Sequence, residues 1–301
     1  MGLDSISVDS AKTGQLRLLG LVLTCALPLV LAGSAILVLF TLIFSNETFS
    51  QIPLIPLVSI FLIWTDRKRV LSRLSFNWVW GPVLVVSGLI AVTAAKLNLP
   101  QSSPNNRACL LAFGIVLTWM GAFALFCGAR AFRAAIFPLL FLAFMIPIPE
   151  PVLSKTIYLL QTGSADVAEG LFKLGGVPYL RRDFIFVLPG VAIRVAEECS
   201  GIRSSLALLI TTVLASRFFL RSTWRRFWLC VAVVPLAILK NGLRIATLST
   251  LAVYVNPDFL QGRLHHQGGI VFFTIALLFM AVLLVLLQRS EKPRLAVAKG
   301  L

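Results

Sequence analysis

Apolar stretches about as long as a membrane is thick recur along the chain and are separated by short polar connections. A helix needs about 20 apolar residues to cross a hydrocarbon core about 30 Å thick. The pattern predicts about eight such helices, at residues 18–44, 52–64, 78–96, 108–128, 132–148, 202–219, 227–254 and 269–288. The fold class that follows is all-α, a polytopic bundle of transmembrane helices.

Two of these stretches carry features that disturb a regular span. Residues 52–64 form a short stretch with Pro53 and Pro56, whereas the long stretch 227–254 contains Lys240, Asn241 and Arg244. We expect the long stretch to break or bend near its charged residues. The first stretch, 18–44, is too long for the apolar core of a signal peptide and no small-residue cleavage site follows it, which predicts a span.

Residues 149–201 interrupt the pattern, because they are too polar to span a bilayer and too apolar for a disordered linker. Residues 152–174 have the character of an amphipathic helix. Residues 181–201 hold two β-branched or aromatic runs around Pro189–Gly190, which predicts a short hairpin or paired extended segments. Without an internal repeat or a second soluble domain, residues 1–301 are expected to form one integral membrane domain. Its parts are N-terminal spans at 18–148, this segment at 149–201, further spans at 202–288 and a tail at 289–301.

Composition supports the membrane assignment and limits what the charge can mean. Hydrophobic residues make up 58% of the chain and charged residues only 13%, whereas a soluble domain carries about 25% charged residues. The formal net charge of +15 would suit nucleic acid. The Lys and Arg residues, however, lie in short clusters between apolar segments, as orientation in a membrane requires. We therefore expect lipid as a partner and no nucleic-acid site.

The basic clusters also predict an orientation. They fall at alternate connections, near residues 12–17, 67–73, 130–133, 217–226 and 289–299. Because cytoplasmic connections are rich in Lys and Arg, both termini are predicted to be cytoplasmic. Residues 149–201 and 256–268 are then outside the cell membrane.

Four of the five cysteines lie in or at the ends of apolar stretches, where a thiol behaves as a small hydrophobic group. No pair has the spacing of zinc ligands, and an odd, scattered set does not indicate a disulfide framework. The sequence therefore predicts neither a metal nor a cofactor. Cys199 differs from the other four, because its neighbours are polar.

Polar residues gather in three segments, 197–205, 239–249 and 262–273, and the predicted orientation places all three at the external face. Cys199 precedes the span at 202–219. Ser200 can cap that helix, and the positive end of a helix favours the nucleophilic thiolate. Gly201 leaves room for a substrate backbone, while nearby carboxylates oppose ionisation. A structural thiol at a helix entry is the other interpretation.

Arg244 and two histidines could complete such a site. An arginine near a helix end can simply extend its side chain to the interface. Asn241, however, lies three residues earlier on the same face, and ionisable residues within spans usually mark function. Arg244 could stabilise a thiolate or an oxyanion. His265 and His266 are the only histidines. They are either interfacial loop residues or the source of a general base, and the residues alone do not decide which histidine would be the base. Together these residues favour acyl transfer by a thiol.

The same residues resemble the motifs of the exosortase/archaeosortase family. The family's cysteine motif is similar to the stretch from Ala196 to Ser204, with Cys199, Ser200, Gly201, Ile202 and Arg203. Its arginine motif matches Asn241, Gly242, Leu243 and Arg244. Its histidine motif matches His265 and Gly269, which favours His265 over His266, although Ile270 stands where the family often has Trp. The close resemblance covers residues 139–273.

The resemblance implies a membrane cysteine peptidase or transpeptidase. Its substrates would be secreted proteins with a C-terminal PEP-CTERM-like signal: a short motif, a membrane-spanning helix and a basic tail. Cys199 would form a thioester, His265 would transfer protons and Arg244 would stabilise charge, with His266 and Arg203 in support. An acceptor nucleophile of unspecified identity would resolve the thioester.

Two other classes remain open at this point. A transporter or channel would distribute polar residues over several spans and often contain an inverted repeat. A non-catalytic assembly factor would keep the fold and lose the chemistry. A metalloprotease is not indicated, because HExxH is absent and the two histidines are adjacent.

Overall fold

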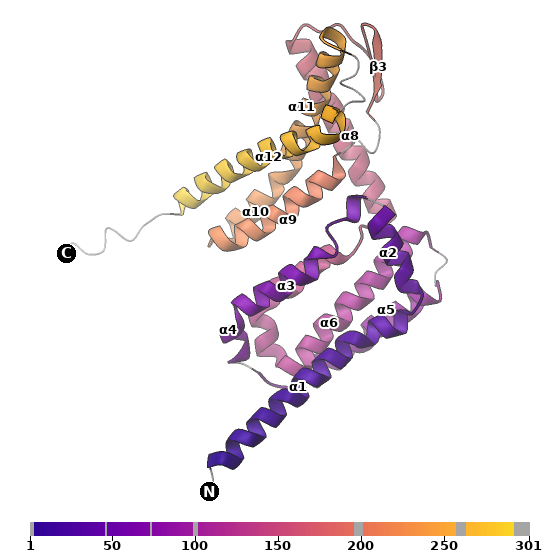
Figure 1. Cartoon of the computed structure of the whole chain (residues 1–301). Helices are drawn as coiled ribbons and strands as arrows, with labels where there is room; N and C mark the ends of the chain where they lie inside the picture. The colour runs from indigo at the N-terminus through magenta and orange to yellow at the C-terminus, as the bar shows by residue number, and fades with distance from the viewer. Residues whose placement is uncertain are drawn as a thin grey trace, which may run out of the picture. The chain divides into compact units, whose positions relative to one another are not determined.

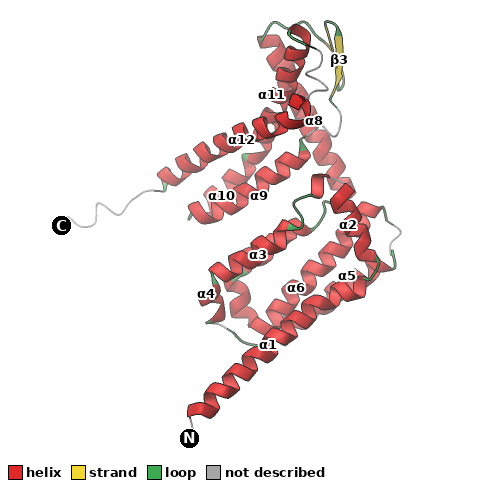
Figure 2. Ribbon diagram, in the orientation of Figure 1, coloured by secondary structure: helices red, strands yellow, loops and turns green. Residues whose placement is uncertain are grey.

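The computed structural model of the chain describes residues 3–45, 47–72, 74–98, 102–195, 201–256 and 263–291. It contains two compact units, Met1–Glu150 and Pro151–Leu301, and each is described by itself. Figure 2 shows that helices make up most of the described chain. The prediction of an all-α helix bundle is confirmed.

All the regular elements of the first unit's described residues are helices (Figure 1). Its elements are α1 (Leu3–Ala32), α2 (Ala35–Ser45), η1 (Glu47–Phe49), α3 (Leu54–Thr65), α4 (Arg67–Leu71), α5 (Trp80–Lys96), α6 (Pro104–Ala134), α7 (Ile136–Phe141) and η2 (Leu142–Met145).

Small residues let α5 and α6 approach each other closely. A Cβ atom added at Gly88 would lie 2.7 Å from the backbone nitrogen of Thr118, and one added at Gly114 would lie 2.7 Å from the Gly88 carbonyl oxygen. Only glycine fits at these positions, and small residues are typical of helix contacts within membranes. The pair forms the tightly packed centre of this unit.

Two predicted spans of the first unit are divided. Residues 18–44 separate into α1 and α2 at Gly33, whose φ of +53° lies in the left-handed region. Residues 132–148 separate into α7 and η2, and Pro147 and Pro149 follow directly. Because proline lacks the N–H group that a helix needs, the chain leaves the helix there.

The second unit combines helices with a small sheet. Its elements are α8 (Glu150–Leu174), β1 (Leu180–Arg182), β2 (Ile185–Leu188), β3 (Val191–Arg194), α9 (Ile202–Phe219), α10 (Thr223–Val231), α11 (Val233–Tyr254) and α12 (Arg263–Ser290). The amphipathic helix predicted at 152–174 is thus α8, and the predicted hairpin is a three-stranded sheet.

The sheet is antiparallel in the order β1-β2-β3, with Phe186 opposite Arg181 on one side and Ile193 on the other. Along β2 the side chains alternate, so that Phe186 and Leu188 are buried while Ile185 and Val187 are exposed. This is the pattern of a sheet with one packed face. Phe186 packs edge-on against Phe172 of α8, with ring centroids 5.4 Å apart.

Helices α9 to α12 share one buried apolar cluster, which includes Leu208 of α9, Val233 of α11 and Ala276 of α12. The end of α12 meets the end of α9 through Glu291, so these two helices run in the same direction and begin at the same end of the bundle (Figure 1). Whatever lies at the beginning of α9 therefore shares an end of the bundle with the beginning of α12.

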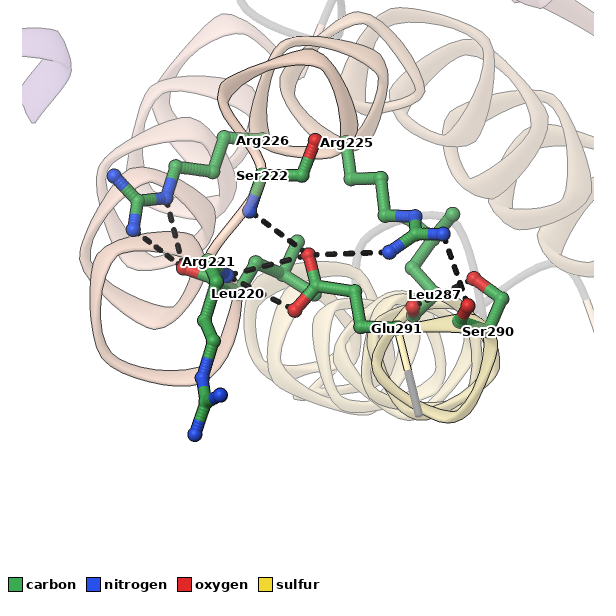
Figure 3. Close-up of polar contacts among 8 residues, drawn as sticks. All are labelled: Leu220, Arg221, Ser222, Arg225, Arg226, Leu287, Ser290 and Glu291. Carbon is green, nitrogen blue, oxygen red and sulfur yellow. Dashed lines mark hydrogen bonds and ion pairs between the residues drawn. The ribbon is translucent and has the colours of Figure 1, made fainter. Parts of the chain in front are cut away.

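Figure 3 shows the contact that joins the other ends of these helices. The Glu291 carboxylate accepts hydrogen bonds from the backbone N–H groups of Arg221 and Ser222, at 3.0 and 2.9 Å. The Arg225 guanidinium lies 3.4 Å from the same carboxylate and donates to the Ser290 carbonyl oxygen over 2.9 Å. Because the first N–H groups of a helix have no partner within it, Glu291 also satisfies the start of α10. We call these contacts the Glu291 clasp.

The expected break at Lys240, Asn241 and Arg244 was wrong. These residues lie within the continuous helix α11, and the break comes earlier, at Ala232 between α10 and α11. Pro235 follows this break and lacks the N–H that would bond four residues back. Lys240 and Asn241 have polar partners on neighbouring helices, described below, so the backbone need not open around them.

Five helical segments among the described residues are long and apolar enough to cross a membrane: Gly14–Ala32, Pro104–Ala134, Ile202–Phe219, Thr223–Tyr254 and Gly269–Ser290. A sixth is obtained if Ile136–Met145 and Glu150–Leu174 together count as one span. The shorter apolar helices α3 and α5, predicted as the spans 52–64 and 78–96, account for the higher estimate of about eight. The chain is a multi-pass membrane protein.

Candidate functional site

The polar residues of α11 lie against the first turn of α9 and against α8. Lys240 is 8% exposed and Asn241 is 1% exposed. The Lys240 ammonium donates a hydrogen bond to the Ser204 hydroxyl of α9. The Asn241 amide donates to the Ser164 hydroxyl of α8 over 3.1 Å. Helix α11 therefore links α8 to the beginning of α9 through buried polar contacts.

Gly201 begins α9 in a conformation that suits glycine alone. Its φ is +76°, in the left-handed region. A Cβ atom there would lie 3.2 Å from Asn241 Oδ1 and 3.4 Å from Lys240 Nζ, so the Gly201 backbone packs directly on α11. The hydroxyls of Ser204 and Ser205 donate to the Gly201 carbonyl oxygen over 2.9 and 2.8 Å. We call this arrangement the Gly201 turn.

The close approach of α8 and α11 depends on Gly242. A Cβ atom at this position would lie 2.5 Å from Val167 Cγ1 and 2.9 Å from the Ser164 carbonyl oxygen. Any larger residue would push α11 away from α8 and disturb the neighbouring Asn241–Ser164 contact. The glycine of the sequence Asn241–Gly242–Leu243–Arg244 thus has a packing role.

The chain on the other side of residues 196–200 is also held. The Val195 N–H group donates to the Phe184 carbonyl oxygen over 2.8 Å, and the Gln161 side chain of α8 donates to the Val195 carbonyl oxygen. Gln161 and Ser164 are both buried. The stretch that contains Cys199 is therefore flanked by two residues with fixed backbone contacts, Val195 before it and Gly201 after it.

Charged residues gather where α8 meets the sheet. The Arg181 guanidinium of β1 lies 2.8 Å from Asp166 and 2.6 Å from Glu169, both on α8. Glu169 also accepts a hydrogen bond from the Tyr179 hydroxyl over 3.0 Å and pairs with Lys173 at 3.0 Å. These contacts fix the sheet on α8, on which Gln161 and Ser164 also lie.

The structure describes several of the predicted site residues. Gly201 and Asn241 are in contact, as described above. Arg244 is half-buried, one turn beyond Lys240 on α11, and Arg203 is exposed in the first turn of α9. Cys199 and Ser200 lie outside the described residues.

The histidine segment is described through its backbone. His265 and His266 lie in the first turn of α12, and Gly269 follows in the same helix. The side chains of the two histidines are outside the described part of the chain. Helices α9 and α12 begin at the same end of the bundle, and the polar stretch of α11 contacts the first turn of α9. The helices that carry the three predicted segments therefore meet at this end.

Three residues of this region were not among the predicted site residues: Gln161, Ser164 and Lys240, which contacts Ser204. A lysine inside an apolar span is a recognisable signal, because ionisable residues there usually face the bundle interior. Gln161 and Ser164 share the buried face of α8 with Ala165 and Ala168. Their helical spacing was visible in the sequence, but the identity of their partners was not.

The described residues contain no group of three or more His, Cys, Asp or Glu side chains that could hold a metal ion. A protein-family model described as transmembrane exosortase matches residues 41–282, well over half of the chain. The match includes the Gly201 turn, the polar stretch of α11 and the first turn of α12. Neither the curated proteins nor the solved structures contain a match to this chain.

Proposed function

The chain belongs to the transmembrane exosortase family, and from this premise we propose that it is a membrane-embedded cysteine peptidase or transpeptidase. It acts on secreted proteins that carry a C-terminal sorting signal. In the PEP-CTERM type, to which this family's motifs point, the signal is a short motif, a spanning helix and a basic tail. Cleavage takes place at the extracytoplasmic face.

The observation that carries this proposal is the construction of the Gly201 turn. Cys199 is two residues before Gly201, so their Cα atoms lie within about 7 Å of each other. The Gly201 backbone packs on the polar stretch of α11 that leads to Arg244. Helix α12, with His265 in its first turn, begins at the same end of the bundle. These features support the proposal that a nucleophile, a cation and a base share one region.

The reaction has two steps. The Cys199 thiolate attacks the scissile carbonyl carbon, and Arg244 stabilises the negative charge that develops on the carbonyl oxygen. The C–N bond breaks, the departing amine takes a proton from the His265 imidazolium, and a thioester remains on Cys199. Water or an acceptor amine then loses a proton to His265 and attacks the thioester. The Cys199 sulfur leaves, and a carboxylic acid or a new amide is released.

A secreted reporter with a C-terminal Pro-Glu-Pro motif, an apolar helix and a basic tail tests the proposal. The reporter is co-expressed with the parent, Cys199→Ala, His265→Ala or His266→Ala, and its mass is measured. Cys230→Ala, which removes a half-buried thiol of α10, is the matched control.

We expect cleavage at the motif with the parent and with Cys230→Ala, and none with Cys199→Ala. His265→Ala should lower the rate by about 10²–10⁴-fold, and His266→Ala far less. The mass of the new C-terminus separates hydrolysis from transfer to an acceptor. Equal cleavage by the parent and Cys199→Ala would exclude a thiol mechanism. A well-inserted parent that cleaves no sorting signal would favour an assembly factor.

A further inference from the structure

Lys240 is a charge in an unusual place. It lies in the middle of α11 and only 8% of it is exposed. Burying an ammonium group is costly, and within membranes such groups are rare unless they serve function. Among the described residues its polar partner is the Ser204 hydroxyl, and no carboxylate there forms an ion pair with it. Within the described ranges, an ion pair therefore does not account for its buried position.

The ammonium belongs to a chain of contacts that ends on the Gly201 backbone. Lys240 Nζ donates to Ser204 Oγ, and Ser204 Oγ donates to the Gly201 carbonyl oxygen over 2.9 Å. A Cβ atom built on Gly201 would lie 3.4 Å from the same Nζ. Lys240 thus contacts the Gly201 turn through Ser204, and its ammonium lies in the space that a side chain at position 201 would enter.

We propose that Lys240 is a positioning residue for the acyl-transfer reaction, in which it fixes the Gly201 turn and holds a positive charge near Gly201, two residues after Cys199 in the sequence. This assignment rests on the function proposed above. In this assignment, Lys240 does not touch the substrate. It acts through Ser204 and Gly201 on the placement of the nucleophile, and through its charge on the thiol, because a nearby cation favours the thiolate.

The predicted site contains several other charges, which must be held constant. Arg203 in the first turn of α9 and Arg244 on α11 favour the thiolate, as Lys240 does. Glu197 and Glu198, next to Cys199 in the chain, oppose it. His265 and His266 lie in the first turn of α12, and histidine is in general the side chain that changes charge near neutral pH. On α8, the neutral Ser164 contacts Asn241 of α11 and the neutral Gln161 contacts Val195. A difference between two variants at Lys240 isolates its own contribution.

Ser204 and Lys240 could instead form a nucleophile and base of their own, since Ser-Lys pairs perform acyl transfer in other folds. The directions of the hydrogen bonds oppose this interpretation. The Ser204 proton is given to the Gly201 carbonyl oxygen, and Lys240 donates to Ser204 in place of accepting from it. The contacts orient the backbone and leave the serine hydroxyl protonated.

The test uses the full chain in detergent, with Cys25, Cys109, Cys127 and Cys230 replaced by Ala so that Cys199 is the one thiol. The rate of alkylation by iodoacetamide is measured from pH 5 to 10. The variants are Lys240→Met, which removes the charge, Lys240→Gln, which keeps a donor for Ser204, and Lys240→Arg, which keeps the charge. Lys155→Met, at an exposed position of α8, is the matched control.

Loss of the charge in Lys240→Met or Lys240→Gln should raise the midpoint of the alkylation profile by about one pH unit, which is about tenfold less thiolate at neutral pH. Lys240→Arg and the control should keep the parent midpoint. In the reporter assay Lys240→Met should lower kcat at least tenfold and leave KM within about twofold. Lys240→Gln decides the question if Lys240→Met does not fold.

Folded Lys240→Met and Lys240→Gln proteins with the parent alkylation profile and kcat would overturn the assignment. Processing by Cys199→Ala that disappears in Cys199→Ala/Ser204→Ala would also overturn it, in favour of the Ser-Lys pair. Alkylation does not depend on peptidase activity. A shifted profile in a chain that cleaves no reporter would therefore refute the proposed function and retain the electrostatic effect of Lys240.

Discussion

Gly201 is the residue at which backbone conformation and the candidate chemistry meet. Its left-handed φ of +76° strains any other residue, and a Cβ atom there would lie 3.2 Å from Asn241 Oδ1, so that Asn241 would have to shift. Two other glycines allow the effect of the positive φ to be separated from the effect of crowding. Gly190 has a φ of +77° with open space around a Cβ, and Gly170 in α8 has open space without a positive φ.

Replacement of these glycines by alanine should therefore give a graded series. Gly170→Ala should leave stability unchanged or raise it by up to about 1 kcal/mol. Gly190→Ala should cost about 1–2 kcal/mol from its φ alone. Gly201→Ala should cost more than Gly190→Ala, because its Cβ atom must also displace Asn241, and it should abolish reporter cleavage. Thermal unfolding in detergent measures the series, and a Gly201→Ala protein as stable and active as Gly170→Ala would contradict the geometry.

Arg244 tests the charge that the mechanism assigns to α11. Arg244→Ala should lower kcat by about 10²–10³-fold, the usual loss when one oxyanion donor is removed. Arg244→Lys should recover part of the rate, since it keeps the charge and loses the planar donor group. Arg130→Ala, at an exposed position of α6, serves as control. Wild-type kcat in a folded Arg244→Ala protein would remove Arg244 from the mechanism.

Among the elements, α9 and α12 are aligned by the Glu291 clasp. The hydrogen bonds that the carboxylate accepts from the N–H groups of Arg221 and Ser222 lower the pKa of Glu291. A carboxyl with a lowered pKa contributes stability above its ordinary value of about 4.3, and this contribution is lost as the pH falls through the lowered value. The clasp should therefore be complete at neutral pH and lost in acid.

Glu291→Gln removes the charge and should cost about 1 kcal/mol at pH 7. Between pH 7 and pH 3 the parent should lose more stability than Glu291→Gln, so that the difference between them shrinks toward acid. Asp183→Asn, at an exposed turn of the sheet, is the control. Chemical unfolding of both proteins at the two pH values is the measurement, and a difference that stays constant with pH would contradict the assigned contacts.

Elements were predictable to the extent that hydropathy and side-chain periodicity determine them. The bounds of α9 coincide with the predicted span 202–219, because a polar, glycine-containing stretch precedes it and a basic cluster follows it. The break in 227–254 was predicted at the wrong place. Polar residues such as Lys240 and Asn241 within an apolar stretch suggest a break, and the sequence does not show that Ser204 and Ser164 are their partners. The division of 18–44 at Gly33 was likewise not predicted, because a single glycine within an apolar run does not reveal its φ.

At the scale of the whole molecule, the basic clusters predict that the start of α9 faces outward and the Glu291 clasp faces the cytoplasm. Two single-thiol proteins test this orientation in intact cells. In one, Cys199 is the sole thiol. In the other, Cys199 is also replaced by Ala and Ser290→Cys, at an exposed position beside the clasp, is the sole thiol.

A membrane-impermeant maleimide should label Cys199 in intact cells, and it should label Ser290→Cys only after the membrane is opened. Denatured samples of both proteins, labelled with a permeant reagent, provide the control for total thiol. Labelling of Cys199 from the cytoplasm alone would reverse the orientation and separate the site from substrates that emerge outside.

The residues of the candidate site stay a prediction from the sequence, and their contacts were not predictable from it. Charge and hydropathy indicated that 197–205, 239–249 and 262–273 share one face, and the common direction of α9 and α12 agrees with a shared end of the bundle. The relay from Lys240 through Ser204 to Gly201 depends on the rotation of α11 about its axis. A sequence pattern gives the buried face of a helix but not which neighbour meets each residue on that face.

The central claim is that Cys199 carries a covalent acyl group during the reaction, and mass spectrometry of the enzyme tests it most directly. The parent is mixed with the reporter, quenched in acid, digested and searched for the peptide that contains Cys199. The account predicts that this peptide carries the reporter's new C-terminal segment, that hydroxylamine releases the segment, and that Cys199→Ala shows neither adduct nor cleavage. Reporter cleavage with the adduct on another residue, or undiminished cleavage by Cys199→Ala, would contradict it.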